Sequence, residues 1–139
     1  MERQEVLEFV KRFPVSHMAT VEDGQPRVRA MQTAVIDDAG LTFCTGSHKD
    51  VCRQLSANPS VELAYWDPSS GCHIRIRGDM EVVGDLDLKQ HIVDHVFTFL
   101  KPVVEAHGHE AITLFRLSSG QTYVWTQAIG HQPPEALPF

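Results

Sequence analysis

Short stretches with an apolar residue at every second position alternate along this chain with stretches that have the helical period of three to four. The helical period runs through residues 2–13, whose apolar positions form one stripe, and Pro14 ends it. A second helical stretch covers residues 86–100 and is interrupted by Pro102. Strand patterns cover residues 17–21, 27–36, 41–45, 61–66, 72–83, 111–117 and 121–125.

Turn-forming residues separate most of these strands at short distances, and several of the turns are rich in aspartate, serine and glycine. The turns are Glu22-Asp23-Gly24, Asp37-Asp38-Ala39-Gly40, residues 67–71 and Ser118-Ser119-Gly120. About seven strands joined as hairpins, with helices between them, predict a mainly β fold. We expect an antiparallel β-barrel with peripheral helices rather than a doubly wound parallel sheet.

The whole chain, residues 1–139, is expected to form one domain. Its tail, about residues 127–139, is too rich in proline for a helix or an inner strand. The tail should therefore run over a surface. Leu137 and Phe139 would let it pack against a neighbour, but a loose tail is the favoured expectation.

A helix is expected to begin near His48, just after the strand that ends at Thr45. Ser47 stands where an N-cap would stand, and Asp50 follows three residues later as in a capping box. Asn58-Pro59 ends this helix. Helix N-termini present free amides and a partial positive charge, which favours a bound phosphate.

Cationic and hydroxyl side chains surround this helix start, and they favour a bound anion. The strand of residues 27–36 places Arg27, Arg29, Met31 and Thr33 on one face by its period of two. Arg29 and Lys49 would add full charges to the helix amides, near the hydroxyls of Thr45 and Ser47. The alternative is that Ser47 only caps the helix while the basic side chains are solvated.

Charge and composition limit the partners of this protein. The formal net charge of −6 argues against a nucleic-acid partner, because such binding depends on a basic surface. No apolar run approaches the ~20 residues that span a bilayer, so no membrane partner is expected. No leader is visible, which favours a cytoplasmic location. Three cysteines without a C-x-x-C pair suit free thiols in a reducing compartment.

Other candidate chemistry is weak. His91 and His95 have a spacing that can bind a metal on one helix face, but no third ligand is evident, so a surface pair is favoured and no metal is expected. The sequence contains no G-x-S-x-G motif, and the scattered cysteines make no catalytic pair.

Four segments together resemble the flavin-binding split β-barrel family typified by pyridoxamine 5'-phosphate oxidase. They are A-T-V-E-D-G-Q-P-R-V-R, F-C-T-G-S-H-K-D-V-C-R-Q-L-S-A-N-P, R-I-R-G-D-M-E-V-V and Y-V-W, in this order. The resemblance covers roughly residues 9–126 and implies flavin mononucleotide (FMN) as the cofactor. It implies that the FMN phosphate is held by the following residues: Arg29, Thr45, Ser47, His48 and Lys49. His48 stands where an arginine is usual in the oxidases.

The resemblance also implies the surroundings of the flavin ring and the assembly. Met31, Gln32 and Thr33 would lie beside the isoalloxazine. Family members are homodimers with the flavin in a groove between two barrels, and Trp125 matches an aromatic residue that commonly reaches the partner's cofactor. The alternative for Trp125 is a core or dimer-interface residue without cofactor contact.

The implied function is a homodimeric, FMN-binding oxidoreductase acting on a small molecule. Vitamin B6 phosphate is not the expected substrate, because true pyridoxamine 5'-phosphate oxidases end in an arginine-bearing segment, whereas the last arginine here is Arg116. The strand also has Thr33-Ala34-Val35 where such oxidases have a lysine. Two alternatives are a split barrel that binds a deazaflavin or haem, and a non-catalytic flavin sensor or storage protein.

Overall fold

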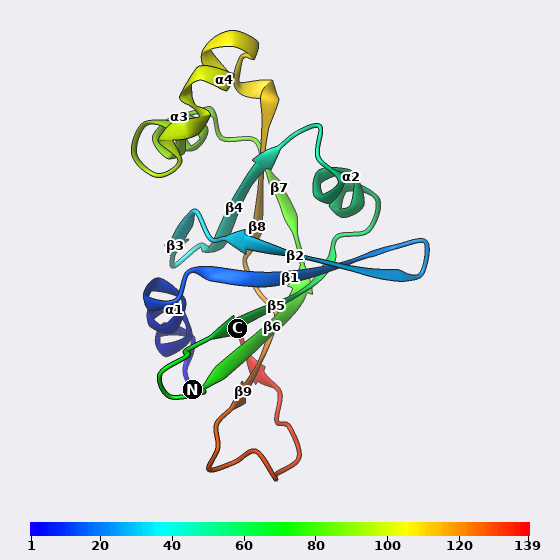
Figure 1. Cartoon of the computed structure of the whole chain (residues 1–139), viewed down its shortest axis with the longest axis vertical. Coiled ribbons are helices and arrows are strands. Elements are labelled where there is room, and N and C mark those ends of the chain that lie inside the picture. Colours follow the sequence, from blue (N-terminus) through cyan, green and yellow to red (C-terminus); the bar gives the residue numbers. More distant parts are fainter.

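The computed structural model describes residues 1–139 and contains two antiparallel sheets (Figure 1). The larger sheet has the strand order β10-β9-β6-β5-β1-β2, and the smaller has the order β3-β4-β8-β7. The larger sheet is formed by β1 (Val15–Glu22), β2 (Gln25–Gln32), β5 (Ser60–Trp66), β6 (His73–Asp79), β9 (Gln121–Trp125) and β10 (Leu137–Pro138). The smaller is formed by β3 (Val35–Asp37), β4 (Gly40–Gly46), β7 (Glu81–Val83) and β8 (Ile112–Leu117).

Four helices surround the sheets, one more than the three peripheral helices that the sequence predicts. They are α1 (Arg3–Arg12), α2 (Asp50–Ala57), α3 (Leu86–His95) and α4 (Lys101–His107). Helix α1 lies beside β3, α2 contacts β1 and β4, and α3 and α4 pack together at the end of the molecule opposite the tail (Figure 1). None of these helices has both the length and the apolar content needed to cross a bilayer.

Three predicted hairpins are confirmed: β1–β2, β3–β4, and β5–β6 across residues 67–71. Strands β1 and β2 pair across the two-residue turn Asp23-Gly24, where both residues have positive φ, of 51° and 75°. Aspartate and glycine tolerate this conformation, which matches the twist of the flanking strands. Strands β3 and β4 pair through Asp37 and Gly40. A Cβ on Gly40 would lie 2.2 Å from the Leu117 carbonyl oxygen, so no other residue fits there.

The predicted strand of residues 72–83 is wrong as a single strand. The chain leaves the larger sheet after Asp79 and joins the smaller sheet at Glu81. Between them Met80 is buried, and its amide donates to the Pro59 carbonyl oxygen at 2.8 Å. The burial of Met80 and its hydrogen bond to Pro59 mark the point where the chain passes from one sheet to the other. The alternation of apolar and polar residues does not reveal this point.

The predicted strand of residues 27–36 also divides between the two sheets. Strand β2 ends at Gln32, and β3 begins at Val35. The intervening amides of Thr33 and Ala34 donate to the carbonyl oxygens of Pro14 and Thr42, both at 2.8 Å. Arg27, Arg29 and Met31 share a face as expected, but Thr33 lies beyond the strand.

The predicted hairpin of residues 111–125 is wrong as well. Strand β8 pairs with β4 and β7, whereas β9 pairs with β6 and β10 across the other sheet. A two-strand pattern flanking a turn normally indicates direct pairing. Here the turn carries the chain from one sheet to the other, which closes the barrel around its main core.

The second helical stretch is shorter than residues 86–100. Helix α3 ends at His95, and the Phe97 amide turns back to the Ile92 carbonyl oxygen at 2.7 Å. A 3₁₀ turn follows at Thr98–Leu100, and Pro102 lies in the first turn of α4. Proline fits a first turn because its missing N–H has no helical partner there. Pro102 therefore helps to begin a helix instead of interrupting one.

The favoured expectation of a loose tail is also wrong. Strand β10 pairs with β9 at the sheet edge, and Phe139 and Gly120 exchange backbone hydrogen bonds of 2.9 and 3.3 Å. The Phe139 ring is buried, and the Arg3 guanidinium lies 4.4 Å from its centroid. Proline is acceptable here because an edge strand needs ladder hydrogen bonds on only one side.

Candidate functional site

A cleft of about 730 Å³ opens between β2 and the first turn of α2. It brings together Arg29 and Met31 of β2 with Thr45, His48 and Lys49, as the anion-site prediction requires. The other lining residues are Glu22, Arg27, Val28, Ala30, Asp50, Val51 and Gln54. Ser47, Gln32 and Trp125 are not among them.

Arg29 is half-buried in this cleft and is held only by uncharged acceptors. Its guanidinium donates to Thr20 Oγ1 at 2.8 Å, to the Met18 carbonyl oxygen at 3.3 Å and to Gln54 Oε1. No carboxylate pairs with it. Burial lowers the pKa of Arg29 from its usual value, but an arginine remains protonated in proteins. The Arg29 charge therefore stands in the cleft without an ion-pair partner, and the nearby Asp50 carboxylate opposes only part of the effect of burial on its pKa.

The predicted N-cap is wrong. Helix α2 begins at Asp50 with Lys49 at the cap position, and no side chain caps it. Ser47 instead turns toward β8, where its hydroxyl donates to the Glu110 carbonyl oxygen at 2.6 Å and lies 2.8 Å from Thr113 Oγ1. The loop that precedes α2 is therefore tied by Ser47 to Glu110 and to Thr113 of β8. Helix α2 starts three residues after this attachment, at Asp50.

Without a side-chain cap, several amides at the start of α2 have no partner. The Lys49 amide donates to Gly46, and the Cys52 and Arg53 amides donate to Lys49. The amides of His48, Asp50 and Val51 have no protein acceptor. All three residues line the cleft. Unpaired amides beside an unpaired guanidinium form an environment that stabilises an anion.

Acidic side chains border the cleft but are occupied by other partners. Glu22 pairs with Arg53, lies 3.8 Å from Arg27 and accepts from Gln54 Nε2 at 2.8 Å. The bonds from Arg53 and then Gln54 hold the pKa of Glu22 below its usual value. Asp50 pairs with Arg53 at 3.0 Å. Both acidic groups therefore form ion pairs with Arg53, and neither forms one with Arg29 or Lys49, although the Asp50 charge raises the pKa of Arg29.

Lys49 and His48 are exposed at the mouth of the cleft, and Lys49 forms no ion pair. A Cβ on Gly46 would lie 2.9 Å from His48 Cε1, so glycine at this position lets the imidazole fold over the loop. Thr45, in contrast, is buried at the end of β4. These positions match the phosphate-binding set that the sequence predicts, with Ser47 displaced.

The three residues expected beside the flavin ring separate in the structure. Met31 and Gln32 line a pocket of about 270 Å³ that adjoins the cleft and shares Thr45 and Lys49 with it. Thr33 is buried in the core, where its hydroxyl lies 2.7 Å from the Tyr65 hydroxyl. Thr33 lines neither the cleft nor the adjoining pocket.

Sequence reasoning missed the aromatic wall of this adjoining pocket. Phe97, Phe99 and Leu100 lie across it from Met31, and the two phenylalanine rings are 5.7 Å apart. These residues belong to a stretch read as continuous helix, so their position near the cleft was not foreseeable. Cys44 also lines the pocket, but burial raises the pKa of its thiol to about 11, which makes it a poor nucleophile.

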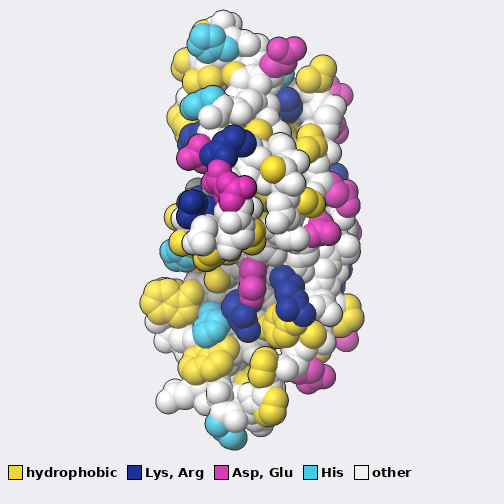
Figure 2. All heavy atoms as spheres, turned by 90° about the vertical axis from the view of Figure 1, so that its right-hand side faces the viewer, with side chains coloured by type: hydrophobic (Ala, Val, Ile, Leu, Met, Phe, Trp, Pro, Cys, Tyr) yellow, Lys and Arg dark blue, Asp and Glu magenta, His cyan; other side chains and the backbone are white.

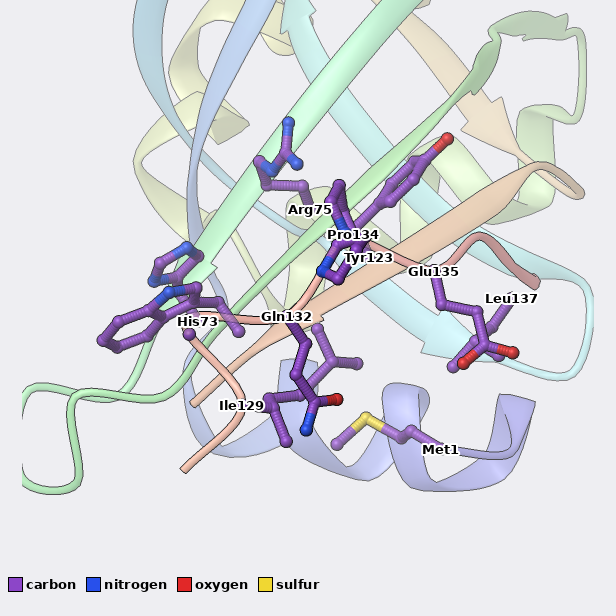
Figure 3. Close-up of a pocket in the computed structure, with 13 residues that line it drawn as sticks. Met1, His73, Arg75, Tyr123, Ile129, Gln132, Pro134, Glu135 and Leu137 are labelled. Atoms are coloured by element: carbon purple, nitrogen blue, oxygen red, sulfur yellow. The ribbon is translucent and has the colours of Figure 1, made fainter. Parts of the chain in front are cut away.

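Trp125 lies in a separate pocket of about 480 Å³, between the strands β6 and β9 and the tail. Its indole stacks on His73 at 5.1 Å between centroids, and the Gly130 backbone approaches the indole so closely that a Cβ would lie 2.7 Å from Nε1. Figure 3 shows His73, Arg75 and Tyr123 on the sheet side, opposite Gln132 and Glu135 of the tail.

Trp125 cannot reach the Arg29 cleft of its own chain along the sheet. Strand β9 is separated from β2 by β6, β5 and β1. Four inter-strand steps amount to about 19 Å along the sheet. Within one chain, Trp125 and the cleft therefore belong to separate pockets.

The outer face of the larger sheet carries large exposed hydrophobic side chains. The register places Trp66, His73 and Trp125 in one row across β5, β6 and β9. Val15, Val21 and Val28 are exposed on β1 and β2. Figure 2 shows hydrophobic, basic and histidine side chains side by side over the lower part of the molecule, toward the tail.

The chemistry of the cleft suits a phosphate monoester attached to a larger planar group. The cleft offers a guanidinium, an ammonium and free amides, which bind phosphate oxygens well. The adjoining pocket is mostly apolar and aromatic. FMN combines both features, and the residues present therefore fit this cofactor.

The curated proteins that this chain matches are pyridoxine/pyridoxamine 5'-phosphate oxidases. A pyridoxine/pyridoxamine 5'-phosphate oxidase from Pseudomonas paraeruginosa is 36% identical over 67 residues, which are 48% of this chain and 31% of that protein. The matched segment thus spans about a third of the length of this curated relative.

Comparison with solved structures covers nearly the whole chain. A NimC/NimA family protein from Clostridium acetobutylicum has a TM-score of 0.75 and 21% identity, with 98% of this chain and 91% of that chain covered. An FAD-binding protein from Mesorhizobium loti has a TM-score of 0.65 and 21% identity, with coverages of 88% and 92%. These likenesses establish the split β-barrel fold.

A family model provides the remaining comparison. The model described as pyridoxamine 5'-phosphate oxidase matches residues 3–125, which include both sheets except β10 and every residue of the cleft. With the barrel and the predicted motif order, this match shows that the chain belongs to the pyridoxamine 5'-phosphate oxidase family of split β-barrel proteins.

Proposed function

We propose that this protein is a homodimeric, FMN-binding oxidoreductase that acts on a small molecule. The observation that carries the proposal is the Arg29 guanidinium, which is half-buried, bonded only to neutral acceptors and adjacent to three unpaired amides. A buried charge without a counter-ion is costly, so an anionic ligand would relieve it.

In this proposal the phosphate lies between Arg29 and the start of α2. Arg29 would provide a forked pair of donors, Lys49 a point charge, and the amides of His48, Asp50 and Val51 further hydrogen bonds. Thr45 would supply a hydroxyl at the base of the cleft. The flavin ring would extend toward Met31 and Gln32, into the pocket bordered by Phe99.

A second chain would complete the site. Large hydrophobic side chains exposed on a sheet face are typical of an interaction surface, and Val15 and Trp66 are 51% and 59% exposed. Packing this face against a second copy would bury them and could bring the partner's Trp125 to the cleft. The partner's aromatic ring would then help to exclude water from the flavin.

Bound FMN would supply hydride or electron transfer, chemistry that no side chain of this protein provides. The residues of the cleft would hold and orient it, and the apolar wall of Phe97, Phe99 and Leu100 would limit access of solvent. The proposal does not extend to vitamin B6 phosphate as the substrate. The aligned segment covers only about a third of the length of the matched pyridoxine/pyridoxamine 5'-phosphate oxidase.

A flavin titration of the purified protein tests the proposal. FMN binding should quench the flavin fluorescence or shift the flavin absorbance. Riboflavin, which lacks the phosphate, should bind more weakly. Protein that takes up neither flavin would contradict the proposal. A Soret band in protein from its native source would identify haem, and a deazaflavin spectrum would identify that cofactor instead.

Turnover separates an enzyme from a sensor or storage protein. The FMN complex should be reduced by a nicotinamide donor and reoxidised by an acceptor. Tight binding with neither reaction, across a panel of donors and acceptors, would favour the non-catalytic alternative.

A further inference from the structure

Gln54 stands at the centre of a hydrogen-bond network below the cleft. It is 4% exposed, although it lies on the apolar stripe of α2 between Val51 and Leu55. Its Oε1 accepts from Thr20 Oγ1 at 2.7 Å and from the Arg29 guanidinium, and its Nε2 donates to Glu22 Oε2 at 2.8 Å. Both the amide oxygen and the amide nitrogen of Gln54 therefore have hydrogen-bond partners.

The direction of these bonds has an electrostatic consequence. The amide oxygen faces Arg29, and the amide nitrogen faces Glu22. Gln54 thus fixes the guanidinium without adding a charge that would cancel it. Glu22 is kept on the other side of the amide, where Arg53 and Arg27 pair with it.

We propose that Gln54 is the positioning residue of the phosphate site: its neutral side chain orients Arg29 toward the cleft and separates it from Glu22, so that the full arginine charge is left for the cofactor phosphate. This inference rests on the proposed function and deepens it. A glutamate of the same shape would satisfy Arg29 and Thr20 equally well, but it would neutralise the site.

The test compares FMN with riboflavin, because the two ligands differ only in the phosphate. In Gln54→Glu we expect Kd for FMN to rise at least about tenfold, the scale of one lost charge-assisted hydrogen bond. The Kd for riboflavin should change less than about twofold on the same scale. A purely structural role of Gln54 would weaken the binding of both flavins together.

A matched control exists in the same protein. Gln121 Oε1 also accepts from a guanidinium, that of Arg77 at 2.7 and 2.9 Å, but it lies outside the cleft. Gln121→Glu makes the same chemical change beside an arginine and should leave the FMN-to-riboflavin affinity ratio at the wild-type value.

A second variant keeps the test decisive if the new carboxylate prevents folding beside Glu22. Gln54→Met retains the volume and neutrality but removes the bonds to Arg29, so it should also lower the FMN-to-riboflavin ratio, by a smaller factor. Thermal melting of each apo variant reports whether the fold is retained.

The possible failures are distinguishable. Wild-type protein that binds neither flavin would overturn the proposed function. Wild-type protein that binds FMN and riboflavin equally would overturn the phosphate site. Wild-type protein that prefers FMN, with folded Gln54 variants that retain the whole preference, would overturn the role assigned to Gln54.

Discussion

Arg29 and Lys49 show how differently two basic side chains can be prepared for one ligand. Arg29 is held before any ligand arrives, by bonds to Thr20, Met18 and Gln54, so its binding costs little side-chain entropy. Lys49 is exposed and unpaired, and it would become ordered only when the anion binds. Arg29 therefore provides a charge that is already oriented, whereas Lys49 provides a charge that becomes ordered on binding.

Removal of the Lys49 charge is expected to weaken FMN binding. In Lys49→Ala the loss should be roughly 1.5–3 kcal/mol, the range for a hydrogen bond to a charged group. This corresponds to a rise in Kd of about 10- to 150-fold. Isothermal titration calorimetry measures the change.

Lys11→Ala provides the control for this measurement, because Lys11 is a surface lysine on α1, paired with Glu8 and remote from the cleft. Its substitution should leave Kd unchanged. An unchanged Kd in Lys49→Ala would show that Lys49 does not contact the phosphate.

The tail is an element that local sequence patterns describe poorly. Its prolines exclude a helix and an inner strand, yet β10 completes the larger sheet at its edge and places Phe139 in the main core. The Arg3 guanidinium covers the ring from the start of α1. Residues near the two ends of the chain therefore contact each other, and the N and C marks lie close together in Figure 1.

Truncation of the Phe139 ring is expected to destabilise the whole barrel. Phe139→Ala should lower the free energy of unfolding by about 3 kcal/mol, the lower end for buried phenylalanines, because a chain end can relax around the cavity. Urea denaturation monitored by tryptophan fluorescence measures the change.

The same substitution at Phe99 serves as the comparison, because Phe99 is 73% exposed. Phe99→Ala should alter stability by less than about 0.5 kcal/mol. Equal stability of Phe139→Ala and wild type would mean that the tail does not pack as described.

The molecule as a whole places the cleft and Trp125 near opposite edges of the larger sheet. The cleft adjoins β2 at one edge, and Trp125 lies on β9 near the other. The proposed dimer reconciles these positions, because a second copy on the outer sheet face can supply the distant edge. Assembly and cofactor binding should then be linked, since each would stabilise the other.

A charge on the outer sheet face should prevent this assembly. Val15→Glu introduces a carboxylate at a position that the dimer would desolvate, so we expect a monomer with weaker FMN binding. Light scattering coupled to size-exclusion chromatography gives the mass in solution.

The matched change on the other sheet is Val82→Glu, since Val82 is 66% exposed on β7. It should leave the oligomeric state of the protein unaltered. A monomeric wild-type protein, or a dimer that survives Val15→Glu, would contradict the proposed interface.

The sequence by itself determined most local elements and brought together most residues of the proposed anion site. Alternation, turn residues and the position of Pro14 predicted α1 and three hairpins correctly, because these features depend on neighbouring residues. The same local reasoning brought Arg29, Thr45 and Lys49 to one place, since two strands and a helix start follow one another directly in the chain.

Only the tertiary structure decided where strands change sheets and which groups support the site. The breaks at Thr33 and Met80 are set by hydrogen bonds to Pro14 and Pro59, which are distant in sequence. Ser47 does not cap α2, and its hydroxyl instead bonds to Glu110 and Thr113, which are more than 60 residues away in sequence. The positions of Gln54 at the cleft and Phe99 in the adjoining pocket also depend on contacts between segments that are remote in sequence. The hydrophobic periodicity of a segment does not encode such contacts.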